Sequence, residues 1–213
     1  ARVSFPIGLT VGADMSDHQP VLMNQALEGL DLHQSGCYID GTYGRGGHST
    51  EILTRLGEQG SLLALDKDPT AVEHAKRNLD ADPRFCIRQG GFENLQEHIE
   101  PWLQGRMLSG ILLDLGVSSP QLQDPERGFS FLKDGPLDMR MNPDIGVTAG
   151  EWLQQVSEGE LISVLRRFGE EPRARRIAQA IIRARDNQPI TSTSRLANIV
   201  AEISGARPHR IHP

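Results

Sequence analysis

The chain has few cysteines, no long apolar run and no net positive charge, and each of these absences excludes a class of protein. Its 213 residues include only Cys37 and Cys86, and both lie in apolar, strand-like runs. We therefore expect buried free thiols in a reducing cytosol rather than a disulfide or a metal pair. No apolar run approaches the roughly 20 residues that a membrane helix needs. Residues 1–14 lack the basic start and apolar run of a secretory signal, so we expect a cytoplasmic protein.

The net charge of −6 argues against a protein that binds polyanions through its overall charge. The charge is uneven, however, because residues 151–213 contain ten Arg and seven acidic residues, a balance of +3, whereas residues 1–150 carry −9. A basic second part beside an acidic first part is compatible with a local nucleic-acid surface.

Hydrophobic periodicity predicts an α/β first half. Short apolar runs predict strands at residues 37–40, 61–66, 85–88 and 110–114, and helical patterns follow the first three of them. His18-Gln-Pro-Val-Leu is expected to lead into a short helix that runs through Leu30. Alternating strands and helices indicate a parallel sheet with right-handed crossovers.

The second half has a different composition. Residues 118–150 are rich in Pro, Gly and Asp and show little periodicity. From Thr148 onward the pattern is helical. Thr148 with Glu151, and Ser157 with Glu160, both fit the capping box that starts a helix. The last helix is expected to end at Gly205.

A glycine-rich turn connects the first strand to its helix. Residues 40–48 are Asp-Gly-Thr-Tyr-Gly-Arg-Gly-Gly-His, and the helical pattern starts at His48. Glycines allow positive φ and close approach of a ligand, and the start of a helix adds unpaired N–H groups. The layout is typical of a nucleotide-type site. The alternative is a tight turn that binds nothing.

Polar and aromatic residues follow the other strands. Ligands of open α/β sheets bind beyond the carboxyl ends of the strands, so the loop Gly44 to His48 should converge with Asp66, Phe92 and Asp114. Asp66 follows Gly44 by 22 residues, close to the spacing of a ribose-binding acid. Its alternative role is a helix cap, for which Asp68 is better placed. Phe92 is expected against an adenine or in the core, and Asp114 in the site or as a cap.

The turn also helps to choose the cofactor. Asp40 precedes the glycines, so the dinucleotide pattern Gly-x-Gly-x-x-Gly is missing. An acid at the mouth of the loop is poorly suited to a pyrophosphate but suits a cofactor with a cationic end. The sequence therefore favours S-adenosylmethionine over a nicotinamide cofactor, and methyl transfer over hydride transfer.

Five segments resemble the bacterial 16S ribosomal RNA cytosine-N4 methyltransferase family. They are His-Gln-Pro-Val-Leu (18–22), Asp-Gly-Thr-Tyr-Gly-Arg-Gly-Gly-His-Ser (40–49), Leu-Leu-Asp-Leu-Gly-Val-Ser-Ser-Pro-Gln-Leu (112–122), Arg-Gly-Phe-Ser-Phe (127–131) and Asp-Gly-Pro-Leu-Asp-Met-Arg-Met (134–141). The resemblance covers residues 18–213. It implies an S-adenosylmethionine-dependent enzyme that methylates the exocyclic N4 amine of a cytosine in the decoding centre of 16S ribosomal RNA, within the small ribosomal subunit of a bacterial cytoplasm.

The resemblance also implies a fold and its division. The fold is a class I, Rossmann-like methyltransferase core with an inserted all-helical domain. The expected parts are an N-terminal arm or cloning remnant (1–17), the first four strands of the core (18–118), a connecting region (119–147) and a helical insertion that contacts RNA (148–213). Family members continue beyond this chain and return to the sheet, so the resemblance implies that a C-terminal part is absent here.

Most of the expected cofactor contacts are carried over by motif, Gly44 comes from the glycine loop, and the catalytic residues come from their position after the fourth strand. The expected cofactor contacts are Gly44, Gly46, Gly47, His48, Asp66, Phe92, Asp114 and Gln121, without a metal. DNA amino-methyltransferases place a polar-Pro-Pro-aromatic motif after the fourth strand, where this chain has Ser118-Ser119-Pro120. Catalytic roles are therefore expected for Asp114, Ser118 and Ser119, although the serines also suit a helix or turn cap.

An arginine-rich helix, predicted from Pro172 to about Asp186, is the candidate RNA surface. Its arginines are Arg173, Arg175, Arg176, Arg183 and Arg185. The alternative is a solvated face with Glu170 and Glu171 as partners. The Asp138-Met-Arg-Met segment either touches RNA or braces the two parts of the chain. Two other classes remain open, a nicotinamide-dependent oxidoreductase and a non-enzymatic RNA-binding protein.

Overall fold

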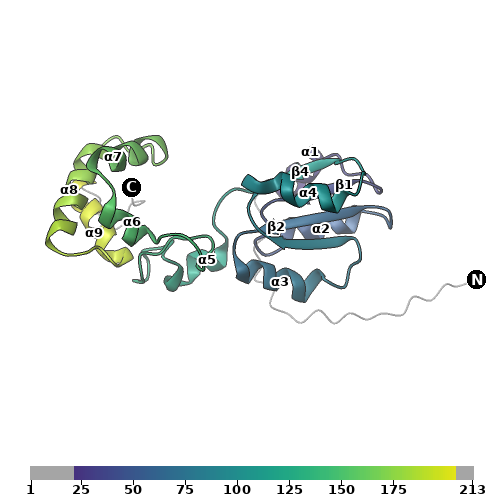
Figure 1. Ribbon diagram of the computed structural model, residues 1–213, viewed down its shortest axis with the longest axis horizontal. Coiled ribbons are helices and arrows are strands. Elements are labelled where there is room, and N and C mark those ends of the chain that lie inside the picture. Colours follow the sequence, from purple (N-terminus) through teal and green to yellow (C-terminus); the bar gives the residue numbers. More distant parts are fainter. Residues whose placement is uncertain (1–21, 205–213) are drawn as a thin grey trace, which may run out of the picture.

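Four short strands form a parallel sheet in the computed structural model, which describes residues 22–204 (Figure 1). The strands are β1 (Cys37–Asp40), β2 (Ser61–Asp66), β3 (Phe85–Gln89) and β4 (Gly110–Leu112), in the spatial order β3-β2-β1-β4. This is the order of strands one to four in a Rossmann fold. The predicted α/β, Rossmann-like sheet is confirmed. The predicted arm, most of the segment that starts at His18 and leads into the first helix, and the predicted helix end at Gly205 lie outside the described residues.

Alternating side chains of the two central strands explain why helices cover both faces of the sheet. Tyr38 and Leu62 pack against α1 (Met23–Gly29) and α2 (Gly47–Arg55), and Ala64 packs against α3 (Pro69–Leu79). Ile39, Leu63 and Leu65 point to the other face, where α4 (Leu95–Leu103) covers them. Strands buried on both faces are nearly continuous apolar runs, as the sequence showed.

The fourth strand is shorter than predicted. The ladder with β1 ends where the N–H of Gly41 donates to the carbonyl of Leu112 at 2.9 Å. Beyond it the N–H of Asp114 donates to the Thr42 hydroxyl at 2.7 Å, so a side chain replaces the next ladder bond. Asp114 therefore lies two residues past the end of the strand.

The second half is helical, as predicted. Its helices are α6 (Ala149–Gln155), α7 (Glu158–Arg167), α8 (Ala174–Asn187) and α9 (Thr193–Ser204), and Figure 1 shows them grouped away from the sheet, with α5 (Ser119–Gln123) between. They enclose a core of their own that includes Leu161, Ile177 and Ile181. Thr148 and Glu151 form the predicted capping box, and the Ser157 hydroxyl accepts from the Glu160 N–H. Within residues 22–204, no helix is long and apolar enough to cross a membrane.

Two of the quoted motifs cross each other in the connecting region. The carbonyl of Arg127, the last residue of a 3-10 helix η2 (Pro125–Arg127), accepts from the N–H of Met139 at 3.1 Å. Gly128 adopts φ 72°, and a Cβ there would lie 2.6 Å from both the Pro136 carbonyl oxygen and the Asp138 nitrogen. Only glycine fits a crossing in which both neighbours are backbone.

The crossing generates a stability prediction. Gly128→Ala should lower the free energy of unfolding by roughly 3 kcal/mol or more, because the cost of positive φ adds to the displacement of backbone. Gly146→Ala is the matched control, since Gly146 has φ 79° but, among the described residues, no packing neighbour within 4 Å of the place that a Cβ would take. Its cost should be only about 1 kcal/mol. Denaturant titrations of both variants measure the difference, and equal losses would contradict the crossing.

Candidate functional site

The loop after β1 joins the ends of the two central strands. Gly44 and Gly46 have φ values of 57° and 77°, and Gly46 is the N-cap of α2. The N–H of Gly44 donates to Oδ2 of Asp66, at the end of β2, over 2.7 Å. The structure thus brings together the glycine loop and the acid that the sequence paired with it.

The structure gives the helix-cap role, which the sequence left open for Asp66, to Asp68. Asp68 is the N-cap of α3, since its Oδ1 accepts from the Thr70 N–H at 2.9 Å. Asp66 caps no helix, and its Oδ1 accepts from the Asp68 N–H at 2.9 Å. Burial raises the pKa of Asp66 above its usual value, although the bonds from Asp68 and Gly44 lower it. Each carboxylate oxygen keeps acceptor capacity for a ligand.

Asp40 is not at the mouth of the loop, which corrects the expectation from the sequence. Its side chain is fully buried, and it accepts from the Thr42 N–H at 3.1 Å and from the Ser49 hydroxyl at 2.7 Å. Burial is the largest influence on the pKa of Asp40 and raises it, although the hydrogen bond from Ser49 lowers it. A residue at the end of a central strand lies beneath the loop, because the chain crosses over it. Asp40 therefore shapes the loop and is not available to a ligand.

The exposed acid near this loop is Asp114. Its side chain is 61% exposed, and its Oδ2 lies 3.5 Å from Nε2 of the buried His48. The other ring nitrogen of His48, Nδ1, is buried and has no hydrogen-bond partner among the residues that the structure describes. His48 and Asp114 thus connect the start of α2 to the segment after β4, as the convergence of strand ends requires.

Phe92 lies at the rim of the same loop rather than in the core. It is 43% exposed, at the start of the 3-10 helix η1 (Phe92–Asn94). Its Cβ is 3.8 Å from the position that a Cβ on Gly41 would occupy. The core alternative is therefore wrong, and an exposed ring stands beside the glycine loop.

The residues after β4 have structural partners. Ser118 is the N-cap of α5, and its N–H donates to Oε1 of Gln121 at 2.8 Å. Gln121 is buried, and its Nε2 donates to Oδ2 of Asp68 at 2.8 Å. Ser119 is the half-buried first residue of α5. The Gln121 amide thus ties the first turn of α5 to the acid that caps α3.

The arginines of α8 do not share one environment. Arg175, Arg176 and Arg183 are exposed, and Arg173 is the exposed N-cap. Arg185 is only 14% exposed, and it donates to the carbonyls of Leu153 and Val156 at 2.5 and 2.7 Å. Its guanidinium therefore caps the end of α6, which corrects its place in the candidate RNA surface. At 100° per residue, Arg185 falls on the buried side of the helix.

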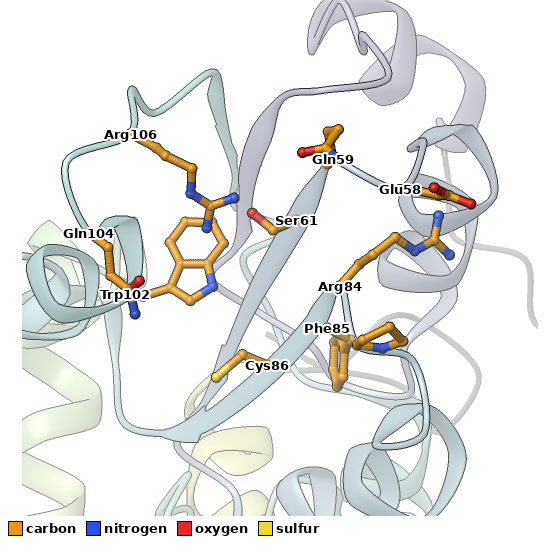
Figure 2. Close-up of a pocket in the computed structure, with 11 residues that line it drawn as sticks. Glu58, Gln59, Ser61, Arg84, Phe85, Cys86, Trp102, Gln104 and Arg106 are labelled. Carbon is orange, nitrogen blue, oxygen red and sulfur yellow. The ribbon is translucent and has the colours of Figure 1, made fainter.

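A shallow hollow of about 400 Å³ lies at the opposite ends of the strands, near Ser61 and Phe85 (Figure 2). Figure 2 shows Trp102 and Arg106 on one side of it and Arg84 on the other. Arg84 is paired with Asp82 at 2.5 Å. Because the hollow is at the amino ends of the strands, it is separate from the candidate site.

Comparisons with known proteins match the chain to one family model and to curated relatives. The family model described as the MraW methylase family matches residues 15–213. The ribosomal RNA small subunit methyltransferase H of Xylella fastidiosa strain M12 is 52% identical over 201 residues, which cover 92% of this chain and 63% of the relative. The protein of the same name from strain M23 is 51% identical with the same coverage. The chain thus spans less than two thirds of the length of these curated relatives.

Among solved structures, a protein-L-isoaspartate O-methyltransferase aligns with 54% of this chain and 35% of its own, at 18% identity and a TM-score of 0.37. The family model, which matches nearly the whole chain, decides the assignment. The chain belongs to the MraW methylase family.

Proposed function

We propose that this chain is the cofactor-binding and RNA-binding part of an S-adenosylmethionine-dependent enzyme that methylates the N4 amine of a cytosine in the decoding centre of 16S ribosomal RNA. The observation that carries the proposal is the bond between Gly44 and Asp66, which sets a buried acid beside a glycine loop at the ends of β1 and β2. The family supports methyl transfer, and the relatives named for the small-subunit ribosomal RNA support the substrate. The partner is then 16S ribosomal RNA in a bacterial cytoplasm.

Each candidate cofactor residue has a task in this proposal. Asp66 accepts hydrogen bonds from the ribose hydroxyls, and the exposed ring of Phe92 lies against the adenine. The backbone of Gly44, Gly46 and Gly47 allows close approach, as only residues without a Cβ do. His48 and Asp114 face the amino-acid end, where the exposed carboxylate of Asp114 suits an ammonium group. Gln121 does not touch the cofactor but positions Asp68 by a hydrogen bond to its carboxylate.

The bound cofactor supplies a methyl group on a sulfonium, which is a good electrophile. The cytosine amine is a weak nucleophile because its lone pair is delocalised into the ring. The protein must accept hydrogen bonds from the amine so that the lone pair turns toward the methyl group. We propose Ser118, Ser119 or a carbonyl near Pro120 as acceptors, since they follow β4 directly after Asp114. Alignment of this kind is worth roughly 7–11 kcal/mol in favourable cases.

The RNA surface in this proposal is the exposed side of α8, within the predicted helical insertion of residues 148–213. Arg175, Arg176 and Arg183 face solvent there and contact phosphates. Phe168, at the end of α7, is 76% exposed, and the Arg167 guanidinium lies 5.5 Å from its ring centroid. An exposed ring with arginines nearby suits stacking of an unpaired base. A cytosine in structured RNA must also leave its stack before methyl transfer.

The direct test is transfer of tritiated methyl groups from S-adenosylmethionine to small ribosomal subunits that lack the modification, with the full-length protein. Incorporation at a cytosine N4 is expected. Binding of NAD in place of S-adenosylmethionine would favour an oxidoreductase instead, and RNA binding without affinity for either cofactor would favour a non-enzymatic role.

Asp66→Asn should weaken S-adenosylmethionine binding by roughly 1–3 kcal/mol, the scale of hydrogen bonds to a charged group. Because burial raises the pKa of Asp66, wild-type affinity should fall as the pH drops through that raised value, whereas the variant should show little dependence. The raised pKa of Asp66 by itself favours the folded state at low pH, whereas the lowered pKa of Asp68 disfavours it, so a melting curve at each pH separates loss of binding from unfolding. Calorimetric titrations at several pH values measure both effects, and an unchanged affinity would remove Asp66 from the ribose site.

Reversal of Arg175, Arg176 and Arg183 to Glu should weaken RNA binding and leave cofactor affinity unchanged. The salt dependence of RNA binding should also become less steep, because fewer phosphate contacts release fewer counterions. Filter binding at a series of salt concentrations gives the slope. An unaltered slope would make this surface an ordinary solvated helix face.

Arg185→Ala is the contrast on the same helix. It should lower the free energy of unfolding by roughly 1–3 kcal/mol, because two carbonyls at the end of α6 lose a charged donor, without a change in the salt slope.

Asp114→Asn should raise the S-adenosylmethionine concentration needed for half-maximal rate and change the saturated rate little, because the carboxylate holds the cofactor. The double variant Ser118→Ala, Ser119→Ala should instead lower the saturated rate, since its contacts matter most as the amine reacts. A single-turnover assay at saturating cofactor separates the two. Normal methyl transfer by the serine variant would exclude the serines as acceptors.

A further inference from the structure

Arg127 joins three parts of the chain through one guanidinium. Its Nη1 donates to Oδ2 of Asp68 at 2.5 Å, and its Nη2 donates to the carbonyls of Arg140 and Met141 at 3.0 and 2.9 Å. The Arg127 side chain is 13% exposed and that of Asp68 only 3%. Because this ion pair is buried, the loss of either partner would leave the other as an unpaired, desolvated charge.

On one side, Arg127 is two hydrogen bonds away from the candidate ribose acid. Burial would raise the pKa of Asp68, but the bonds from Arg127, Gln121 and Thr70 outweigh it and lower that pKa, which favours the ionised carboxylate. The N–H of the same Asp68 donates to Oδ1 of Asp66 at 2.9 Å. The position of Asp68 thus sets one of the backbone bonds that orient Asp66.

On the other side, Arg127 binds the segment of residues 134–141, which is hydrogen-bonded to the helical bundle formed by α6, α7, α8 and α9. Leu137 is buried in the bundle core, and its N–H donates to the Thr191 carbonyl at 2.9 Å. The N–H groups of Ala149 and Gly150, in the first turn of α6, donate to the carbonyls of Asp138 and Leu137. Asp134 accepts from the Ser194 N–H in the first turn of α9 at 3.0 Å. Residues 134–141 are therefore held to α6 and α9 by hydrogen bonds and by the packing of Leu137.

We propose that Arg127 is a positioning residue that couples cofactor binding at Asp66 to the placement of the helical bundle on RNA. This rests on the proposed function, since it concerns how the two binding surfaces of that enzyme act on each other. RNA that fixes the bundle also fixes residues 134–141, and through Arg127 and Asp68 it pre-orients Asp66 for the cofactor. By linkage, bound cofactor raises affinity for RNA by the same factor.

The chemistry of the contact requires arginine. A guanidinium presents donors in a fixed planar fork, so one side chain reaches a carboxylate and two carbonyls together. Lysine keeps the charge but has a single nitrogen on a flexible stem. Arg127→Lys should therefore keep an ion pair to Asp68 and lose the simultaneous hold on residues 140 and 141.

The test measures cofactor affinity with and without RNA in the full-length protein. The ligands are S-adenosylhomocysteine and small ribosomal subunits that lack the modification. In the wild type, saturating RNA should tighten S-adenosylhomocysteine binding about fivefold or more, the lower end of usual coupling strengths. In Arg127→Lys the ratio should fall to about one, and RNA affinity measured with and without cofactor should change in parallel. A wild-type ratio of one, or a wild-type ratio retained in Arg127→Lys, would overturn the coupling.

Two further variants separate coupling from stability. Arg84→Lys is the matched control, because Arg84 also bonds a carboxylate, that of Asp82, and a carbonyl, that of Leu56, but at the other end of the sheet. It should keep the wild-type ratio whatever its melting temperature. Asp68→Asn retains a capping oxygen for Thr70 and loses the charge, so it should lose the ratio as Arg127→Lys does.

The proposed function fails separately. If wild-type protein binds no S-adenosylhomocysteine at all, the cofactor assignment is wrong. If it binds cofactor and RNA independently of each other, only the coupling is wrong.

Discussion

The buried carboxylate of Asp40 is the constraint on which the site geometry depends. It ends a central strand, where the chain must leave the sheet, and it holds both the Thr42 N–H and the Ser49 hydroxyl. These two bonds close the glycine turn onto the first turn of α2. The loop then presents the Gly44 N–H to Asp66 and the Thr42 hydroxyl to Asp114. An unpaired carboxylate in this position would be costly, so the turn and the acid require each other.

A second set of polar contacts, centred on Asp68, supports the candidate site from the protein interior. Asp68 receives Thr70, Gln121 and Arg127 at once, and it is nearly inaccessible to solvent. Such a network is stable only when every member is satisfied. It fixes the start of α3, the first turn of α5 and the end of η2 relative to one another. Behind the end of β2, the candidate site is therefore supported by contacts that run through Arg127 to residues 140 and 141, whereas Phe92, after β3, and Asp114, after β4, are exposed.

Periodicity was sufficient to predict the sheet, because β1 and β2 are apolar on both faces and end in acids. The same reasoning misplaced Asp40, since alternation gives the face of a side chain but not whether the following loop covers it. Arg185 shows the reverse case. Its place on the buried side of α8 follows from its helical spacing to Ile177 and Ile181. The prediction missed this because it grouped the arginines by their number and not by the face of the helix. One partner of Arg127, Asp68, lies 59 residues away in the sequence, and its other partners are main-chain carbonyls. No local sequence pattern reveals either kind of contact.

The crossing at Gly128 has a consequence for how such chains can recombine. Residues 125–128 and 135–141 touch through main-chain atoms and tolerate no Cβ between them, so neither can be exchanged without the other. A chimaera that joined this sheet to the helical bundle of a distant relative would need its junction before Pro125, because residues 134–141 are also bonded to α6 and α9. A breakpoint at Leu132 or Lys133, the most exposed part of the segment and the obvious place to cut, would separate two halves of a single interlocked unit.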